Sequence, residues 1–528
     1  MSRPTSYPTG DEFRSAARRE GGVDRRVFMA YVAGLTAAPL VSMAGSASAG
    51  MPEYPFTLGV ASGDPAARSV LLWTRLAPRP MEIGGGMDPL PVTVTWEVAE
   101  DEQFKKVVSS GREMATPQLG HSVHAVAEGL RPDRWYYYRF TAGGAHSPVG
   151  RTRTTPTKFD SPEGFRFAFA SCQHYETGHY AAYRHMADQD LDMVVHLGDY
   201  IYEGKAGKGV RQHIGRELES LDDYRRRHAL YRGDALLQAM HARCPWMVTW
   251  DDHEFDNNYA ASISEKLEVD PVDFLIRRAN SYQAYYEAMP LRPRSLPKGP
   301  NMRLYRKVRI GDLAEMYVLD TRQYRCDQPQ GDGKHAIDAA CLAANQSMLG
   351  AEQLEWLEAS LLTSSSRWNI LAQQVMMGAV DIAADGHGYS MDQWSGYVGE
   401  RNRLLSFIEE RRISNPVVLT GDIHSNWVND LHADDLNDKS SLVATEFVGT
   451  SISSGGNGPK KTDLSKLQSK NPNVKFHDRQ RGYVACELNR DNWTTRFYAV
   501  DDVTKTDSRV DELASFVVES GKPGAQKA

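Results

Sequence analysis

Four apolar, strand-like runs between residues 165 and 427 each end in side chains that commonly bind metal ions. The runs read "FRFAFASCQH", "LDMVVHLGDYIY", "WMVTWDDHEFDNN" and "NPVVLTGDIHSNW". In α/β sheets the functional crevice lies at the carboxyl ends of the strands, so residues that follow separate strands can converge in space. The sequence therefore predicts a metal site built from side chains at these ends, which include Cys172, His174, Asp199, Tyr202, Asp251, Asp252, His253, Asn257, Asn258, Asp422, His424 and Asn426.

The chemical types of these side chains predict more than one kind of ion. Carboxylate and amide oxygens suit hard cations such as Ca²⁺ or Mg²⁺. Imidazole, thiolate and phenolate suit a transition metal, and phenolate in particular favours Fe³⁺. A mixed set indicates two or more ions that share a bridging carboxylate. Such a pair, about 3.5–4 Å apart, acidifies a bound water and holds both oxygens of an in-line displacement at phosphorus.

The strand pattern divides the chain into two regions. Residues 56–155 contain short β-branched and aromatic runs separated by Gly, Pro and Asp turns, which predict an all-β region. Its segment "GLRPDRWYYYRF" resembles the corner of a fibronectin type III sandwich, with Tyr136 or Tyr138 as the corner tyrosine. From about residue 165, strands alternate with helical stretches such as "AEQLEWLEASLL", which is typical of a layered α/β domain. We therefore predict a β-sandwich over residues 50–157 and an α/β domain over residues 158–528.

The tail "RVDELASFVVES" predicts a last amphipathic helix, because Val510, Leu513 and Val517 fall on one helical side. A short, late helix of this kind could lie over the pocket as a lid.

Residues 1–49 have the layout of a twin-arginine export signal. Arg25 and Arg26 precede a moderately apolar stretch, and the small residues Ala47 and Ala49 mark a cleavage site before Gly50. A membrane anchor is the alternative, but Gly, Ala, Thr and Ser dilute the apolar run. We expect the export machinery of the twin-arginine route to be a partner, and the mature protein to be periplasmic or extracellular.

Charge and cysteine content limit the other options. The formal net charge is −7 and no dense Lys/Arg block occurs, so a nucleic-acid-binding surface is not expected. Cys326 and Cys341 lie close in a loop-like stretch and could form a disulfide, as could Cys244 and Cys486, which leaves Cys172 unpaired.

Seven motifs occur in the order seen in PhoD-type alkaline phosphatases, which are relatives of the purple acid phosphatases within the metallophosphoesterase superfamily. They are "ASCQ", "GDYIYE", "WDDHE" followed by "NN", "DTRQYR", "GAEQLEWL", "GDIHSN" and "GTSISSGG". The resemblance covers roughly residues 50 to 500, and the sandwich and the export signal also fit that family.

The resemblance implies a role for each matching residue. Cys172 resembles a thiolate ligand of Fe³⁺, Asp199 the carboxylate that bridges the metals, and Tyr202 the phenolate on iron. Asp252 takes the place where relatives have a metal-binding Asn. The remaining implied positions are His253 near the leaving group, Asp422 on a divalent ion, and His424 on iron. Asn258 could be a further ligand of the divalent ion, although a purely structural role is an equal alternative. The family is implied to use calcium at the divalent positions.

These residues lead to one functional prediction. We expect a secreted phosphatase that hydrolyses small phosphoesters through a metal-bound hydroxide at an Fe³⁺/Ca²⁺ centre, with His253 assisting the departing alkoxide. Arg322, in "LDTRQYR", could hold the substrate phosphate by bidentate contacts, although a structural salt bridge is an equal alternative, as it is for Asp320. A phosphodiesterase or phospholipase D acting on phospholipid or another diester is the alternative activity. The oligomeric state stays open.

Three other interpretations compete with this prediction. Taken alone, Cys172 is more typical of a buried small hydrophobe, and Asp199 of a turn. A serine hydrolase is disfavoured because "GTSIS" lacks the second glycine of G-x-S-x-G. An adhesive or binding protein would explain the sandwich, but it would not explain four ligand-bearing strand ends.

Overall fold

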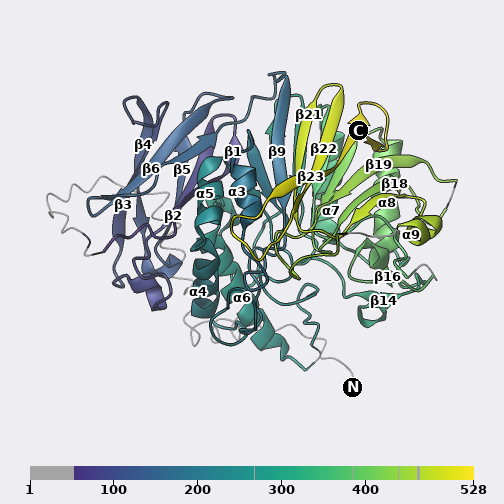
Figure 1. Cartoon of the computed structure of the whole chain (residues 1–528), viewed down its shortest axis with the longest axis horizontal. Coiled ribbons are helices and arrows are strands. Elements are labelled where there is room, and N and C mark those ends of the chain that lie inside the picture. The colour runs from purple at the N-terminus through teal and green to yellow at the C-terminus, as the bar shows by residue number, and fades with distance from the viewer. Residues whose placement is uncertain (1–50, 52, 267, 384–385, 438, 461–463) are drawn as a thin grey trace.

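The computed structural model describes residues 51 and 53–528, apart from 267, 384–385, 438 and 461–463 (Figure 1). The predicted export signal lies outside the described residues. Two large sheets form the centre of the molecule. The strands of the first are β1 (Val60–Ala66), β2 (Ser69–Arg75), β5 (Ser122–Glu128), β9 (Gly164–Ala170), β10 (Met193–His196), β11 (Trp246–Val248), β21 (Gly482–Asn489), β22 (Asn492–Val500), β23 (Val510–Glu519) and β24 (Gln526–Lys527). They follow the order β24-β23-β22-β21-β9-β10-β11-β1-β2-β5.

The second sheet packs against the first. Its strands are β12 (Arg306–Ile310), β13 (Ala314–Val318), β15 (Trp368–Ala372), β17 (Pro416–Thr420), β18 (Asn426–His432), β19 (Leu442–Val448) and β20 (Val474–Asp478), in the order β12-β13-β15-β17-β19-β18-β20. One shared apolar core holds the two sheets together, with Phe167 and Phe169 from the first and Ile370 and Leu419 from the second. Strands β9, β10 and β11 are parallel, as are β13, β15, β17 and β19, so their carboxyl ends lie at common edges.

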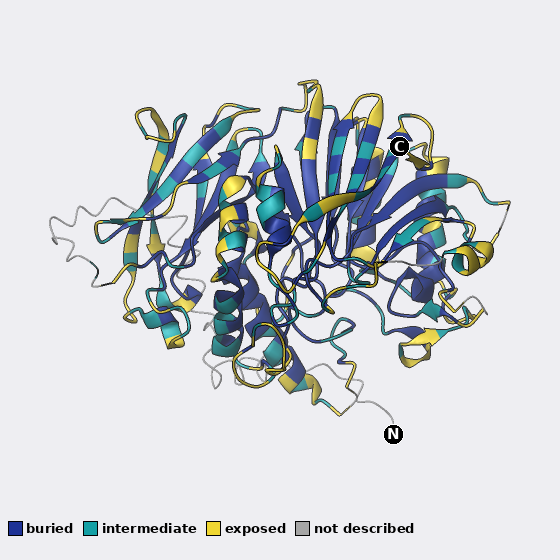
Figure 2. Ribbon diagram, viewed as in Figure 1, coloured by how far each residue is buried: buried dark blue, intermediate teal, exposed yellow. Residues whose placement is uncertain are grey.

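Helices cover the outer faces of both sheets. They are α3 (Ala181–Ala187), α4 (Leu221–Arg232), α5 (Ala235–Arg243), α6 (Pro271–Ala288), α7 (Gly350–Leu362), α8 (Val398–Glu410) and α9 (Ser465–Lys470). On α7, the predicted stripe of Leu354, Leu357 and Leu361 packs into a core with the second sheet. The central strands are buried on both faces, which explains why they read as almost continuous apolar runs (Figure 2). The predicted layered α/β architecture is confirmed. Within the described residues, we find no helix whose length and apolarity would let it cross a membrane.

The N-terminal region forms the predicted sandwich. Strands β1, β2 and β5 face a second small sheet made of β3 (Val92–Ala99), β4 (Val107–Ala115), β6 (Trp135–Ala142), β7 (Ala145–His146) and β8 (Gly150–Arg153). Tyr136 is the corner tyrosine, because its hydroxyl oxygen accepts a hydrogen bond from the backbone N–H of Arg131 at 2.9 Å. Tyr138 is buried as well, but its hydroxyl has no hydrogen-bond partner among the described residues.

The sandwich and the α/β region share one sheet. Strand β1 pairs in parallel with β11, with Gly63 opposite Trp246. The connection between β8 and β9 spans the predicted boundary at residue 157, but the ten-stranded sheet continues across both regions. The sandwich therefore extends the ten-stranded sheet sideways and supports β11, the strand that precedes Asp251.

Two predictions about the fold are wrong. The tail forms strand β23 rather than a lid helix, since Ala514, Phe516 and Val518 alternate into the core and β22 offers an open edge for pairing. All five cysteines are free, so neither predicted disulfide forms. Cys341 packs against Met391, with 3.6 Å between the two sulfur atoms.

Candidate metal centre

The loops that follow β9, β10, β11 and β17 bring the predicted ligands together. Three overlapping groups each place one ligand atom per residue within 4.8 Å of the others. The groups are Cys172–Asp199–His424, Asp199–Asp252–His253 and Asp251–Asp252–Asp422. Asp199 and Asp252 each belong to two groups: Asp199 joins the first group to the second, and Asp252 joins the second to the third. Such shared positions are those expected of bridging carboxylates. Asp251, which the sequence marks only as part of a strand end, belongs to the third.

Tyr202 completes the first group. Its hydroxyl donates to Asp199 Oδ2 at 2.7 Å and lies 3.2 Å from His424 Nε2. The Ser454 hydroxyl donates to the same phenol oxygen at 2.7 Å. The phenol of Tyr202 is thus buried among the other candidate ligands. Tyr200, two residues earlier, points elsewhere and pairs with His241 at 2.9 Å.

The backbone of these loops is held in an unusual conformation. Cys172, Asp199, Asn258, Asp422 and His424 all have positive φ, between 48° and 63°. Non-glycine residues seldom adopt this region, and such conformations concentrate at functional sites where the surrounding structure enforces them. Gly198, with a φ of 110°, permits the closest approach between loops, because a Cβ there would lie 2.4 Å from the Asp251 backbone nitrogen. The fold therefore constrains five of the predicted ligands at their backbone.

Glu254 connects two of the loops that carry candidate metal ligands. The sequence analysis did not identify this residue. Its carboxylate accepts backbone N–H bonds from Asp199 at 3.0 Å, Tyr200 at 2.5 Å and Asp251 at 2.8 Å. Burial raises the pKa of Glu254 to about 7. Its position in the motif "WDDHE" is the sequence feature that could have identified Glu254, but only the tertiary structure shows which amide groups it binds.

Arg322 forms structural salt bridges, which is the alternative to a phosphate-binding role. Its side chain is fully buried, and it donates to Asp251, to Asp392 at 2.8 Å and to Asp422 at 3.3 Å. Burial opposes its charged form, but the surrounding carboxylates raise the pKa of Arg322 well above its usual value. All its nitrogens are thus used by carboxylates. The neighbouring Asp320 is likewise occupied, by the backbone N–H groups of Arg322 and Gln323.

The centre holds more buried negative charge than its cations neutralise. Burial raises the pKa of Asp199 and of Asp251 well above the ordinary range, and raises that of Asp422 to about 7. Asp251 Oδ2 is buried and has no hydrogen-bond partner among the described residues. Buried, unpaired carboxylates are costly, whereas bound cations would stabilise their charged forms. These residues therefore fit metal ions.

The donor types divide the centre into two parts. The group around Cys172 offers a thiol, a phenol, an imidazole and a carboxylate, which suits a transition metal. The group of Asp251, Asp252 and Asp422 offers carboxylate oxygens, which suit a hard cation. Burial raises the pKa of the Cys172 thiol, and coordination to a metal would reverse that effect.

His253 lies at the edge of the centre, with its side chain 23% exposed. Its Nδ1 lies 2.8 Å from Glu203 Oε2, and its ring packs on Tyr202 with centroids 4.2 Å apart. Burial opposes the charged imidazole, but Glu203 and then Asp252 outweigh it and raise the pKa of His253 well above its usual value. Glu203, in "GDYIYE", is therefore a candidate functional residue that the sequence analysis did not identify.

Asn258 is tied to the centre through its backbone. Its N–H donates to Asp252 Oδ2 at 2.7 Å, and its side-chain amide donates to Asp332 at 2.8 Å. It therefore orients Asp252, while its role as a ligand remains a prediction.

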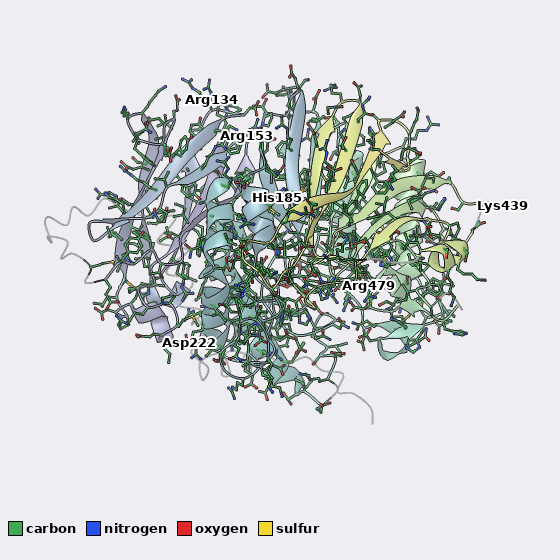
Figure 3. All side chains as sticks on the ribbon, viewed as in Figure 1. Arg134, Arg153, His185, Asp222, Lys439 and Arg479 are labelled. Carbon is green, nitrogen blue, oxygen red and sulfur yellow. The ribbon has the colours of Figure 1, made fainter. Side chains whose placement is uncertain are left out.

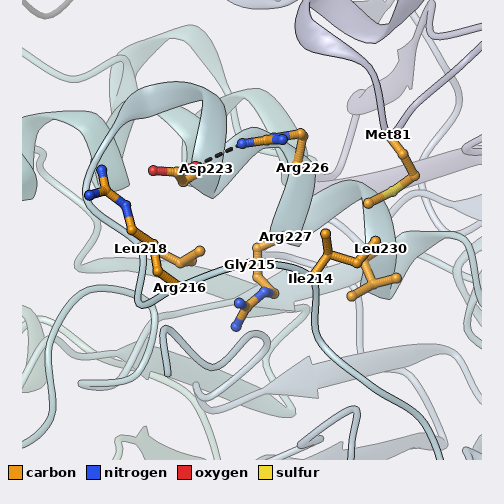
Figure 4. A pocket seen from close by; sticks show the side chains of 9 residues that line it. All are labelled: Met81, Ile214, Gly215, Arg216, Leu218, Asp223, Arg226, Arg227 and Leu230. Carbon is orange, nitrogen blue, oxygen red and sulfur yellow. Dashed lines mark hydrogen bonds and ion pairs between the residues drawn. The ribbon is translucent and has the colours of Figure 1, made fainter. Parts of the chain in front are cut away.

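A pocket of about 250 Å³ lies between α4 and the loop that precedes it (Figure 4). Its lining residues are Met81, Ile214, Gly215, Arg216, Leu218, Asp223, Arg226, Arg227 and Leu230. Arg227 links this pocket to the Tyr202 loop, because its guanidinium donates to the carbonyl oxygens of Tyr202 and Gly204. A nearby group, His174, Glu176 and His213, is occupied by protein contacts: His213 pairs with Tyr231 at 2.9 Å and with Arg227 at 3.0 Å.

Comparisons with known proteins agree with this geometry. The family model described as "PhoD-like phosphatase" matches residues 167–497, and "PhoD-like phosphatase, N-terminal domain" matches residues 42–156. Alkaline phosphatase D of Bacillus subtilis (strain 168) is 49% identical over 484 residues, covering 90% of this chain and 82% of the relative. A solved structure described as "Structure of PhoD" matches with a TM-score of 0.88 and 48% identity, covering 90% of this chain and 93% of that one. The chain therefore belongs to the PhoD-like phosphatase family and is an alkaline phosphatase, a phosphoric ester hydrolase.

Proposed function

We propose that this phosphatase is an exported, metal-dependent enzyme whose centre contains Fe³⁺ and Ca²⁺. The observation that supports this most is the overlap of the ligand groups, within a centre that offers two kinds of donor: Asp199 joins the Cys172 group to the His253 group, and Asp252 joins the His253 group to the carboxylate group. Cys172, Tyr202 and His424 would hold iron, Asp251, Asp252 and Asp422 would hold calcium, and Asp199 would bridge them. When bound, the ions acidify a water molecule and neutralise charge on phosphoryl oxygens.

His253 would assist the leaving group. The contact between its Nδ1 and Glu203 holds the ring in place, and Nε2 forms no hydrogen bond with the described residues. Glu203, which contacts Nδ1, raises the pKa of His253 and so favours the protonated ring. His253 can therefore donate that proton from Nε2 to the departing alkoxide, while Glu203 stabilises the imidazolium before transfer.

Glu254 and Arg322 would support the reaction without contacting substrate. Glu254 keeps the Asp199 and Asp251 loops at a fixed separation through three backbone N–H groups. Arg322 orients Asp251 and Asp422. Because the fold already holds these carboxylates in position, cation binding does not require like charges to be brought together.

Phosphate release from a panel of monoesters and diesters, with metal analysis of the purified enzyme, tests this proposal. We expect iron and calcium in the protein, and loss of turnover when a calcium-selective chelator removes calcium while iron stays bound. Calcium should restore the activity. Full turnover after verified calcium removal would contradict the calcium assignment, and faster turnover of diesters would favour the phosphodiesterase alternative.

The export proposal depends on Arg25 and Arg26. Twin-arginine recognition should require guanidinium groups, which lysine lacks. Replacing both residues with Lys should therefore leave folded, active enzyme in the cytoplasmic fraction, and normal export of that variant would contradict the proposal.

A further inference from the structure

Arg481 is a buried cation without a carboxylate partner. It lies in the connection between β20 and β21, and 8% of the residue is exposed. Its Nη1 donates to the carbonyl oxygens of His424 at 2.7 Å and Arg479 at 2.8 Å. Among the described residues, Arg481 forms no ion pair, its Nε is buried without a partner, and its Nη2 makes no hydrogen bond. A buried charge in this condition is costly unless an anion binds to it.

The position of Arg481 shows where that anion would lie. Nη1 contacts the loop of the candidate iron ligand His424, and a Cβ on Gly455 would approach Nη2 to 3.0 Å. The Gly455 loop is itself attached to the centre, because the Ser454 hydroxyl contacts both the Cys172 carbonyl oxygen, at 2.6 Å, and the Tyr202 hydroxyl. The guanidinium therefore lies between two loops that border the candidate iron ligands.

Nearby groups act on Arg481 electrostatically. Burial lowers the pKa of Arg481, and Arg479 lowers it further. Cys172 and Tyr202 act in the opposite direction. Asp478 also acts in that direction but makes no ion pair with it.

We propose that Arg481 is a substrate-binding residue, whose free guanidinium edge binds a non-bridging phosphoryl oxygen of the phosphoester and of the phosphate product. This inference rests on the proposed function. Arg322, the arginine that the sequence suggests for this task, has its nitrogens engaged by carboxylates. A planar guanidinium with unused N–H groups matches the geometry of a phosphoryl group.

The experiment compares Arg481→Gln, Arg481→Lys and a matched control, Arg479→Gln. Arg479 is two residues away and exposed (Figure 3), so the control makes the same change of charge without removing the buried guanidinium. Each variant is loaded with metal, its iron and calcium content is measured, and KM and kcat for p-nitrophenyl phosphate are determined. Calorimetry gives the Kd of inorganic phosphate for each variant independently of turnover.

For Arg481→Gln we expect KM and the phosphate Kd to rise about 10- to 100-fold, since hydrogen bonds to charged groups contribute this much to binding. Arg481→Lys keeps the positive charge but lacks the paired N–H groups of the guanidinium. KM and the phosphate Kd should therefore rise less than in Arg481→Gln. Arg479→Gln should change both constants less than about twofold, because exposed charges interact weakly in high dielectric.

Three results would overturn the inference. They are unchanged constants in Arg481→Gln, equal changes in Arg479→Gln, and loss of bound metal in both Arg481 variants, which would show a structural role. Should Arg481→Gln fail to fold, unchanged constants in Arg481→Lys would also count against it. A wild-type enzyme that hydrolyses no ester of the panel would contradict the proposed function instead, and phosphate calorimetry would still test Arg481.

Discussion

Replacing Tyr202 with Phe should remove most of the visible absorption of the iron-loaded enzyme and lower its activity at least about tenfold. A phenolate bound to Fe³⁺ gives a charge-transfer band in the visible region, and Phe lacks the oxygen that produces it. The substitution also deletes the contacts with Asp199 at 2.7 Å and His424 at 3.2 Å. The ring keeps its packing against His174 and His253, so the fold should persist. Absorption spectra, iron analysis and kcat measure the three effects.

Tyr200→Phe is the matched control for this experiment. It removes one phenol oxygen from a buried tyrosine two residues away, whose hydroxyl contacts His241 and no candidate ligand. This variant should keep the band and its iron, and show only a modest loss of stability. Full colour in Tyr202→Phe, or a colourless iron-loaded wild type, would show that Tyr202 is not an iron ligand.

A chain that ends at residue 505 should not yield folded, soluble enzyme. Strand β23 pairs with β22 from Val510 to Glu519, and its side chains Ala514, Phe516 and Val518 are buried in the core between the sheets. Burial of a Phe or Val side chain contributes roughly 1.5–3 kcal/mol, so the deletion removes a large part of a typical domain's stability of about 5–15 kcal/mol. It also exposes the backbone edge of β22, which favours aggregation. Soluble yield and thermal unfolding measure the outcome.

A chain that ends at residue 520 is the control for this truncation. It keeps β23 and loses residues 521–528, which include the two-residue edge strand β24 (Gln526–Lys527) and one buried core residue, Ala525. This protein should fold and retain activity. A chain ending at residue 505 that unfolds at the wild-type temperature would contradict the structural role of β23.

The local order of residues was enough to predict the ligand-bearing strand ends. A run that is apolar on both faces must be buried, and a polar side chain directly after it must leave the sheet at the strand end. This reasoning placed Cys172, Asp199 and Asp422 at such ends, and the structure brings them into overlapping groups. The corner tyrosine was predicted from a resemblance to fibronectin type III domains, but only as a choice of two, and the hydrogen bond from the Arg131 N–H decides for Tyr136.

Reasoning from the local sequence could not predict contacts between segments that are far apart in the chain. Asp392 reaches Arg322 from a segment 70 residues away, and Arg481 reaches His424 from 57 residues away. Nothing in either local sequence indicates these partners, because each contact depends on how separate loops are placed by the two sheets. For the same reason, spacing alone could not tell whether Arg322 faces substrate or carboxylates.

The C-terminal tail shows most directly what the sequence determines and what the tertiary structure determines. Its sequence supports a helical stripe through Val510, Leu513 and Val517 and, equally, a strand alternation through Ala514, Phe516 and Val518. The open edge of β22 decides between them, because pairing there satisfies the backbone hydrogen bonds of the segment and buries its alternate side chains. The sequence by itself thus determined the layered fold and the metal-binding strand ends, which follow from burial and periodicity. The tertiary structure alone decided the tail strand, the unpaired cysteines and the partners of each arginine, because these depend on which surfaces the rest of the fold leaves available.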